Sequence, residues 1–386
     1  MKNENVASDE AQRWLGEAIS ALRSKNPADA RSAGFKAVDL GEDGATVWGV
    51  LALACRDVGD FKMAQKAADR SIELEPRNVR AHIVKADAFY AENNVRAAAA
   101  FYRHAIAMSA PQPGMPDEIR LDLERAKTRS AELQESFGAH LSLALGDLLN
   151  GQDCTPRMQE ALDILLGNKR VFYSAPRHFM FPRLPSYEFF PVDQLLWLNQ
   201  LASKTPHVKA ELDALLKSGS SFLPYLEDNP DRPTFDAHGM EGNPDWGALY
   251  LWQNGEPVLE HQEVCPVTTE AIANLPLVFS GGRCPNVLFS RLSAGASIPP
   301  HNGMINTRLI GHLPLIIPDH CGLRVGSEVR EWVVGEPFLF DDTVEHEAWN
   351  NSNQDRVILI FEVWRPELTS VEQTFVKRML EAVDTY

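Results

Sequence analysis

Side chains 34 residues apart are alike through the first third of the chain. Trp14, Trp48 and His82 share one register. Small residues occupy three further registers, which are Ala18, Ala52 and Ala86; Ala30, Ala64 and Ala98; and Ala37, Ser71 and Ala105. Small side chains at a fixed spacing let neighbouring helices cross closely, and units of this length bury their apolar faces only by stacking on one another. The first third is therefore predicted to be a stack of helix pairs.

This period resembles the tetratricopeptide repeat family. Pro76 stands where the second helix of such a repeat ends, because proline cannot continue the interior of a helix. The prolines of residues 110–116 interrupt the pattern, and the amphipathic stretch 117–149 is predicted to close the stack as one or two helices. We predict a repeat domain at residues 11–150, preceded by a disordered N-terminus at residues 1–10.

Length and charge limit the classes of protein to which the chain can belong. Its 386 residues exceed what one hydrophobic core usually organises, so two domains are expected. A net charge of -16 argues against nucleic-acid binding, which needs a surplus of Lys and Arg. No apolar run approaches the ~20 residues that span a bilayer, and the N-terminus lacks the pattern of a secretory signal. We therefore expect a cytoplasmic protein with no membrane partner.

A change in composition predicts the second domain. Residues 151–191 become rich in proline and aromatic residues and are predicted to connect the domains, and residues 192–217 are predicted to be helical. Short β-branched and aromatic runs follow at residues 248–252, 286–292, 306–317, 322–325, 336–340 and 356–363. This spacing favours an antiparallel barrel or a double-sheet jelly roll. The predicted fold class is α + β, with a helical solenoid followed by a jelly roll at residues 192–386.

One of these runs predicts a polar cavity. Successive side chains of a strand point to opposite faces, so Asn306, Arg308, Ile310 and His312 share one face while the leucines of the run take the other. A strand that packs outward on leucines presents this mostly polar row to the inside of the barrel. A polar interior implies a ligand.

The order of the residues around this strand resembles the double-stranded β-helix (cupin-like) oxygenases. His301 lies upstream, His346 downstream, and Arg356 ten residues further on. In those enzymes two histidines bind iron, and a basic residue about ten positions past the second one pairs with the distal carboxylate of 2-oxoglutarate. Neutral imidazole suits Fe(II), and a guanidinium can grip a carboxylate with two hydrogen bonds. The facial triad also has a carboxylate two residues after the first histidine, but that position is Gly303 here.

Gly303 makes the resemblance more specific. The chain resembles the aspartyl/asparaginyl β-hydroxylases, which bind iron with two histidines and have glycine where the facial triad has its carboxylate. The matching segments are DWGALYLWQNG at 245–255, PHNG at 300–303, NTRLIGHL at 306–313, FDDTVEHEAW at 340–349 and VWRPEL at 363–368. Five ordered segments over about a third of the chain make the match specific. Helical repeats also precede this domain in the family.

The resemblance implies a role for each matched position. His301 and His346 would be the iron ligands, and Ser290, His312 and Arg356 would surround 2-oxoglutarate. The resemblance also implies that Arg308 would face the substrate. About 13 Å along the strand separates Arg308 from His312, so the two are not expected to hold the same end of a small cosubstrate.

Further positions are less sharply defined. Trp252 is the candidate aromatic contact of the substrate, with a core position as the alternative for it and for Trp246. Animal members have a second arginine where this chain has Ile310, so either the cosubstrate is held by fewer charges or the substrate carries one fewer acidic group. Asp341 and Asp342 are solvated turn residues or orient an imidazole.

By this resemblance, the chain uses Fe(II), 2-oxoglutarate and O2 to hydroxylate the β-carbon of Asp or Asn residues in a peptide or protein, which the repeats could present. One alternative keeps the chemistry on a lipid acyl chain or small molecule. The other is a catalytically inactive, repeat-based adaptor. Retention of both histidines and of Arg356 argues against that second alternative.

Overall fold

The structure is a computed structural model, and it describes residues 2–109, 115–192, 195–226, 241–280 and 282–386. The chain divides into two compact units, Met1–Leu166 and Gly167–Tyr386, and each is described by itself. The division falls inside the predicted connecting region. Within the described residues, no helix is both long and apolar enough to cross a membrane.

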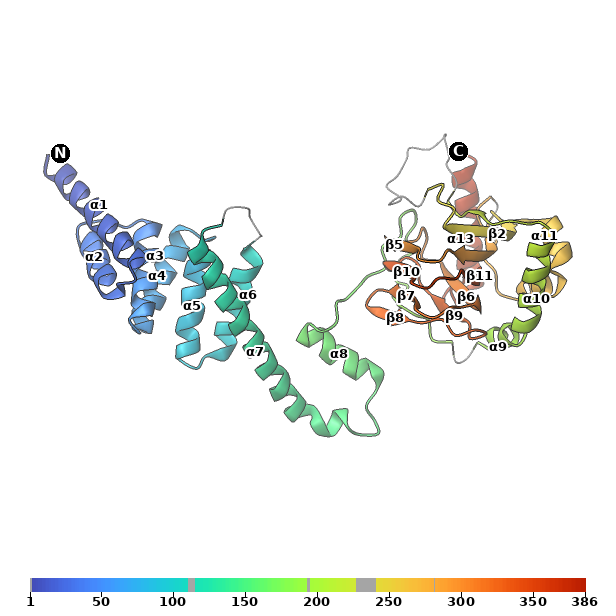
Figure 1. Ribbon diagram of the computed structural model, residues 1–386, viewed down its shortest axis with the longest axis horizontal. Coiled ribbons are helices and arrows are strands. Elements are labelled where there is room, and N and C mark those ends of the chain that lie inside the picture. The colour runs from blue at the N-terminus through green and yellow to red at the C-terminus, as the bar shows by residue number, and fades with distance from the viewer. Residues whose placement is uncertain (1, 110–114, 193–194, 227–240, 281) are drawn as a thin grey trace. The chain divides into compact units, whose positions relative to one another are not determined.

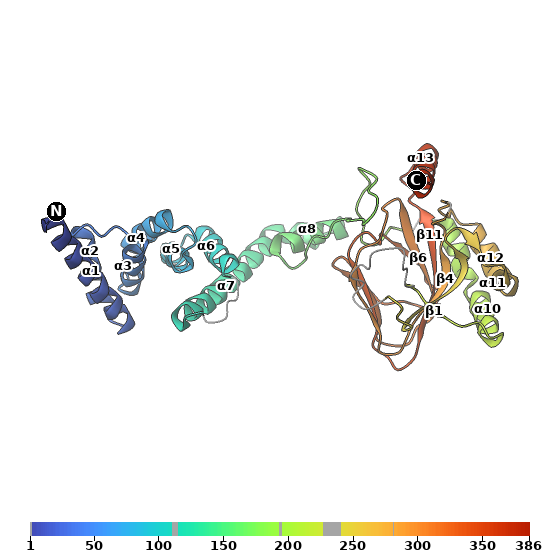
Figure 2. The same ribbon diagram turned by 90° about the horizontal axis from the view of Figure 1, so that it is seen from above.

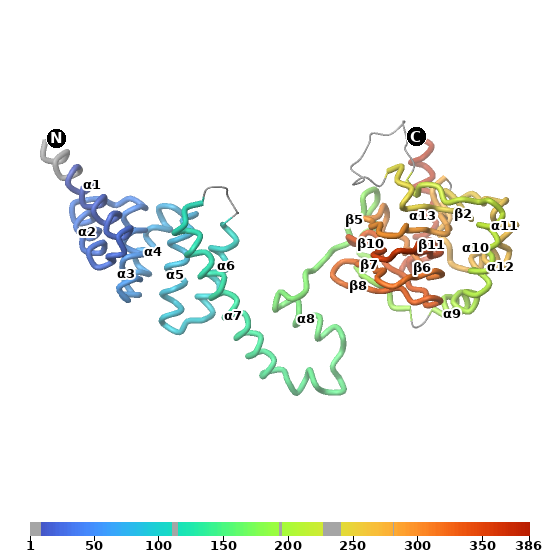
Figure 3. The backbone as a smooth tube through the Cα atoms, viewed as in Figure 1, coloured from blue at the N-terminus to red at the C-terminus, as the bar shows by residue number. Residues whose placement is uncertain are grey.

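The first unit consists of helices only. They are α1 (Lys2–Arg23), α2 (Pro27–Asp39), α3 (Ala45–Asp57), α4 (Phe61–Leu74), α5 (Val79–Ala91), α6 (Val95–Met108), α7 (Asp117–Leu149) and α8 (Pro156–Leu166). The first six form three successive hairpins, which Figure 3 traces from blue to cyan. The nine small residues of the three repeat registers are all fully buried. The predicted repeat of helix pairs is therefore confirmed, and the amphipathic stretch after it is the single helix α7.

Local sequence explains where these helices begin. The side chains of Asn26, Asp60, Asn78 and Asn94 each accept a hydrogen bond from the backbone N–H three residues later, which satisfies an otherwise unpaired donor at a helix start. Helix α1 begins at Lys2, so the N-terminus predicted to be disordered is helical. Its polar composition suggested disorder, but residues 2–10 contain no glycine or proline to interrupt a helix.

The second unit contains two antiparallel sheets. Their strands are β1 (Leu223–Pro224), β2 (Trp246–Gln253), β3 (Glu256–Pro257), β4 (Val287–Leu292), β5 (Ser297–His301), β6 (Arg308–Ile316), β7 (Cys321–Val325), β8 (Glu328–Arg330), β9 (Phe338–Phe340), β10 (His346–Asn350) and β11 (Arg356–Trp364). The larger sheet has the order β1-β2-β4-β11-β6-β9, with β3 beside β2, and the smaller has the order β5-β10-β7-β8. From β4 onward the chain distributes its strands between the two sheets, which is compatible with the predicted double-stranded β-helix.

Helices cover the outer face of the larger sheet. They are α9 (Leu196–Ser203), α10 (Thr205–Lys217), α11 (Leu259–Val264) and α12 (Pro266–Ala273), while α13 (Ser370–Asp384) packs elsewhere, against Ile305. Figures 1 and 2 show α10 and α11 along one side of the strands, and Figure 2 shows α12 there as well. The stretch predicted to be helical contains two helices that meet at Lys204, because Pro206 starts a new helix instead of continuing α9.

Alternation along the strands separates two cores. Odd-numbered side chains such as Leu309, Leu313 and Leu359 pack against the helices, in one buried cluster. Even-numbered side chains such as Ile310 and Ile358 lie between the two sheets, in another. This is the alternation predicted for the strand that carries His312. It points the even-numbered side chains of β6 into the space between the sheets.

Candidate active site

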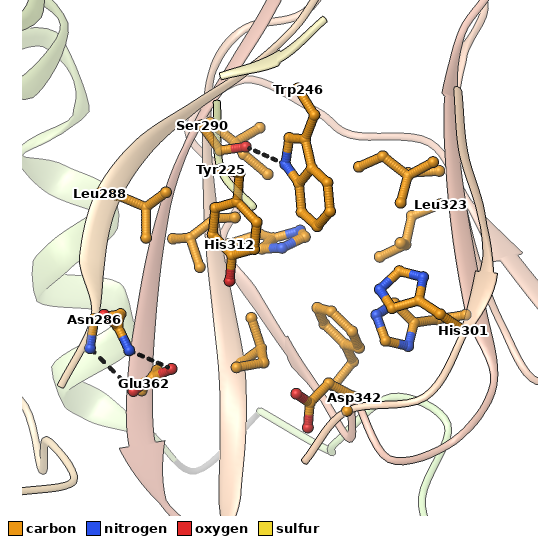
Figure 4. Close-up of a pocket in the computed structure, with 18 of the residues that line it drawn as sticks. Tyr225, Trp246, Asn286, Leu288, Ser290, His301, His312, Leu323, Asp342 and Glu362 are labelled. Atoms are coloured by element: carbon orange, nitrogen blue, oxygen red, sulfur yellow. Dashed lines mark hydrogen bonds between the residues drawn. The ribbon is translucent and has the colours of Figure 1, made fainter. Parts of the chain in front are cut away.

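A pocket lies between the two sheets, and the larger sheet lines it with the even-numbered side chains of its strands. Strand β4 contributes Leu288 and Ser290, β6 contributes Arg308, Ile310 and His312, and β11 contributes Arg356, Ile358, Ile360 and Glu362. The smaller sheet contributes His301 from β5, Leu323 from β7 and His346 from β10 (Figure 4). Every residue predicted to bind iron or 2-oxoglutarate therefore lines one cavity.

The two predicted iron ligands face each other. His301 and His346 are paired in the register of β5 and β10, and their ring centroids are 4.1 Å apart. His301 Nδ1 lies 2.8 Å from the carbonyl oxygen of Pro299, and His346 Nδ1 lies 3.0 Å from that of Val344. A carbonyl oxygen can only accept, so each Nδ1 carries a proton, and the neutral form of each ring then has its lone pair on Nε2.

Burial keeps the second of these imidazoles neutral. Desolvation, with the His301 ring close by, lowers the pKa of His346 to about 3. A neutral ring with its lone pair on Nε2 is the form that binds a metal. Among the described residues, no group of three or more His, Cys, Asp or Glu is arranged to hold a metal, so these two rings form a pair without a carboxylate.

The predicted cosubstrate residues lie at another part of the wall. Arg356 is 2% exposed, and its guanidinium donates a long hydrogen bond of 3.5 Å to the backbone oxygen of Ser290. Burial lowers the pKa of Arg356 to about 10, which still leaves the group charged at neutral pH. Burial and the charge of Arg356 both lower the pKa of His312, so this imidazole is neutral. A buried cation beside a neutral imidazole is suited to hold an anion.

These observations agree with comparisons with known proteins. Residues 202–366 match the family model of aspartyl/asparaginyl beta-hydroxylases. The human aspartyl/asparaginyl beta-hydroxylase is 36% identical over 126 residues, which are 32% of this chain and 16% of that protein. The ornithine lipid ester-linked acyl 2-hydroxylase of Rhizobium tropici is 30% identical over 173 residues, which are 44% of this chain and 58% of that enzyme.

The C-terminal unit is an aspartyl/asparaginyl beta-hydroxylase domain. The chain spans less than two thirds of the length of either relative. Among solved structures, a tetratricopeptide domain of Arabidopsis OM64 matches 32% of this chain and 98% of its own, at 18% identity and a TM-score of 0.27.

Arg308 lines the pocket of the hydroxylase domain, but its charge is already compensated. Its guanidinium contacts Glu362 at 2.5 Å and Asp342 at 3.2 Å, and all three side chains are largely buried. Sequence reasoning missed Glu362. The signal was present, because this is the one acidic residue in an apolar strand and its even number places it on the same face as Arg356.

Asp342 is buried, so the solvated-turn alternative given for it is wrong. It is 6% exposed rather than solvated, and burial, opposed by Arg308, raises its pKa to about 6. Its carboxylate fills the space where a Cβ at Gly303 would stand, and its Oδ1 is buried without a hydrogen-bond partner among the described residues. Asp341 is also fully buried, where it pairs with Arg365 at 2.9 Å. The glycine therefore makes room for a carboxylate from another part of the chain.

The prediction that Trp252 binds substrate is wrong. Trp252 packs in the core between the larger sheet and its helices, whereas Trp246 lines the pocket. The two residues have the same parity, but a β-bulge between Tyr250 and Trp252 reverses the side to which the later residue points. Trp246 donates to Ser290 Oγ at 3.3 Å and stacks on Tyr225, a lining residue that the strand pattern could not identify because β1 has only 2 residues.

Proposed function

We propose that the domain is an Fe(II)- and 2-oxoglutarate-dependent dioxygenase that hydroxylates an unactivated carbon. The observation that supports this most directly is the pair of imidazoles, His301 and His346, which converge from two strands on one side of a pocket. Bound Fe(II) would allow O2 to deliver one oxygen atom to a C–H bond while 2-oxoglutarate is decarboxylated to succinate. Membership of a hydroxylase family supports the same reaction class.

The residues present fit both groups. Two nitrogen ligands leave coordination positions for the cosubstrate, for O2 and for water, which an iron oxygenase requires. Arg356 would hold the distal carboxylate of 2-oxoglutarate, with His312 and Ser290 beside it, because a buried cation without an anionic partner gains most from such a ligand. Asp342, whose Oδ1 lacks a partner, would orient a water molecule that completes the metal shell.

The reacting group would be the β-carbon of Asp or Asn in a peptide or protein, as the family name indicates. The helical repeats would be the part of the chain that binds the rest of that substrate. Of the two residues, we propose Asn as the better substrate. Arg308 already contacts two carboxylates, Asp342 and Glu362, and Ile310 adds no charge, so an aspartate would meet a cation that is already neutralised.

A lipid acyl chain is the second candidate. Much of the pocket wall is aliphatic or aromatic, including Leu288, Ile310, Leu323 and Ile358. The relative from Rhizobium tropici is named for hydroxylation of an acyl chain. An apolar wall would accommodate such a chain as well as the stem of an amide side chain.

The first experiment tests the cofactors. The full-length protein is reconstituted anaerobically with Fe(II) and 2-oxoglutarate and examined for the visible charge-transfer band of a chelated cosubstrate. We expect the band in the parent protein and its loss in His346→Ala, while Trp197→Ala in the helix-covered core should retain it. Absence of the band from a folded parent protein that has bound iron would overturn the proposal.

The second experiment identifies the substrate class. Peptides that differ only in Asp or Asn, and acylated lipids, are incubated aerobically and searched by mass spectrometry for the gain of one oxygen atom. We expect oxidation of Asn peptides above Asp peptides, and a several-fold shift toward Asp in Glu362→Gln, which leaves Arg308 more of its charge. Oxidation confined to lipids would favour the second candidate.

A further inference from the structure

Trp332 is a buried aromatic residue in an otherwise exposed loop. The loop joins β8 to β9, and its residues Val333 and Val334 are 52% and 50% exposed. Trp332 itself is 4% exposed and belongs to the core between the two sheets. It is absent from the pocket wall, so it stands behind the residues that form the wall. The loop therefore inserts one side chain into the domain.

That side chain contacts two of the proposed cosubstrate anchors at once. The Arg356 guanidinium carbon lies 4.7 Å from the centroid of the Trp332 ring, which is a cation–π contact. On its edge, Trp332 Nε1 donates a hydrogen bond of 3.3 Å to His312 Nδ1. Tryptophan is the natural residue type that offers both a large π-face and an N–H donor without a charge.

The stacking contact fixes the orientation of a cation that has few other restraints. Among the described residues, Arg356 has a single long hydrogen bond, to Ser290, and its Nε has no partner. No carboxylate in the described part of the chain forms an ion pair with it. Packing on the indole is therefore the contact that aims the guanidinium before an anion arrives.

The hydrogen bond fixes the proton of the second anchor. Indole N–H can only donate, so His312 Nδ1 must be the acceptor. The neutral imidazole then carries its proton on Nε2, where it can donate to an oxygen in the pocket. Without this bond, the ring could adopt the other tautomer and present a lone pair to an incoming carboxylate.

We propose that Trp332 is a positioning residue for the cosubstrate, because it aims Arg356 and fixes the tautomer of His312. This inference rests on the proposed function, since 2-oxoglutarate is the anion that the two anchors would bind. Trp332 would act through those anchors and would not touch the cosubstrate itself.

The test measures binding of 2-oxoglutarate to the full-length protein loaded with Mn(II), by isothermal titration calorimetry. Trp332→Phe keeps a ring over Arg356 but removes the donor, and we expect binding about 10-fold weaker. Trp332→Leu removes both contacts, and we expect about 100-fold. Trp197→Phe, which alters an aromatic residue of the helix-covered core, should bind as the parent does.

A double-mutant cycle separates positioning from a general structural role. If Trp332 acts through His312, then Trp332→Phe should weaken binding by less than about 2-fold in a His312→Asn background. Equal losses in both backgrounds would overturn the proposal, as would unchanged binding in Trp332→Phe. KM for 2-oxoglutarate should rise in Trp332→Phe while kcat changes little.

Two controls keep these outcomes interpretable. A parent protein that binds Mn(II) but not 2-oxoglutarate would contradict the proposed function, independently of Trp332. Thermal unfolding of each variant is followed by circular dichroism. If Trp332→Leu does not fold, Trp332→Phe, the smaller change, still decides between the outcomes.

Discussion

Both units of the chain bury arginine side chains, but they differ in whether a carboxylate pairs with the buried charge. In the helical unit, Arg56 lies 3.3 Å from Asp122 and 3.4 Å from Asp87. In the hydroxylase domain, Arg356 is more deeply buried and forms no ion pair with a described residue. A buried charge without a partner is costly, and folding alone gives no reason to retain one.

The difference separates charges that hold the fold from a charge that serves a ligand. The distinction also applies within the hydroxylase domain, where Arg365 is fully buried but pairs with Asp341 at 2.9 Å. Arg308 belongs to the compensated group although it lines the pocket. Position in a pocket is therefore a weaker indication of ligand binding than the absence of a counter-charge.

The largest effect should follow from removing the uncompensated charge. We predict that Arg356→Met weakens binding of 2-oxoglutarate by at least about 100-fold, since charge-assisted hydrogen bonds to one carboxylate are lost. In the absence of cosubstrate, the same variant should be as stable as the parent or more stable by about 1 kcal/mol. Calorimetric titration of the Mn(II)-loaded protein and urea unfolding measure the two quantities.

Arg365→Met is the matched control for that prediction. It leaves Asp341 buried without its cation, so the free energy of unfolding should fall by about 3 kcal/mol. A loss of stability in Arg356→Met as large as in Arg365→Met would contradict the distinction between the two kinds of arginine.

The second prediction concerns the missing ligand of the facial triad. Gly303→Asp restores the usual triad sequence, yet its Cβ would overlap the Asp342 carboxylate. We therefore expect the variant to be less stable by about 2 kcal/mol, with weaker rather than tighter binding of Mn(II). The double variant Gly303→Asp with Asp342→Gly should recover much of both losses. Tighter metal binding in the single variant would show that the Asp342 carboxylate can move aside.

Sequence periodicity predicted the framework because the relevant interactions are local or repeat regularly. The 34-residue registers identified the buried small residues of the helical unit. Alternation along β6 placed Arg308 and His312 on the pocket side. The family resemblance predicted that His301, His346 and Arg356 lie close together. They line one cavity, although they come from three different strands.

Features that depend on contacts distant in sequence escaped prediction. A single β-bulge reversed Trp252, and alternation has no means of detecting a bulge. Gly303 and Asp342 share one space although 39 residues separate them along the chain, as their numbers give. Trp332 lies in a loop where no period applies, so only the folded structure brings it against Arg356.

The smallest predicted effect concerns the paired arginines of the helical unit, which surround Asp122. Burial tends to raise the pKa of Asp122, but Arg56, Arg80 and Arg125 outweigh it and lower the pKa below its usual value. The stabilisation that Asp122 contributes is thus fully present above its unfolded pKa of about 4 and is lost as pH falls through the lower folded pKa.

We predict that Asp122→Asn lowers protection of helices α3, α5 and α7 by about 1 kcal/mol near neutral pH, and by progressively less below about pH 4. Hydrogen–deuterium exchange of the full-length protein, read by mass spectrometry, resolves these helices from the hydroxylase domain. Asp43→Asn, which alters an exposed pair with Arg70, should change protection far less, because solvent screens that pair. A loss that does not diminish in acid would mean that Asp122 stabilises the stack by packing, and its arginines would then no longer count as compensated by charge.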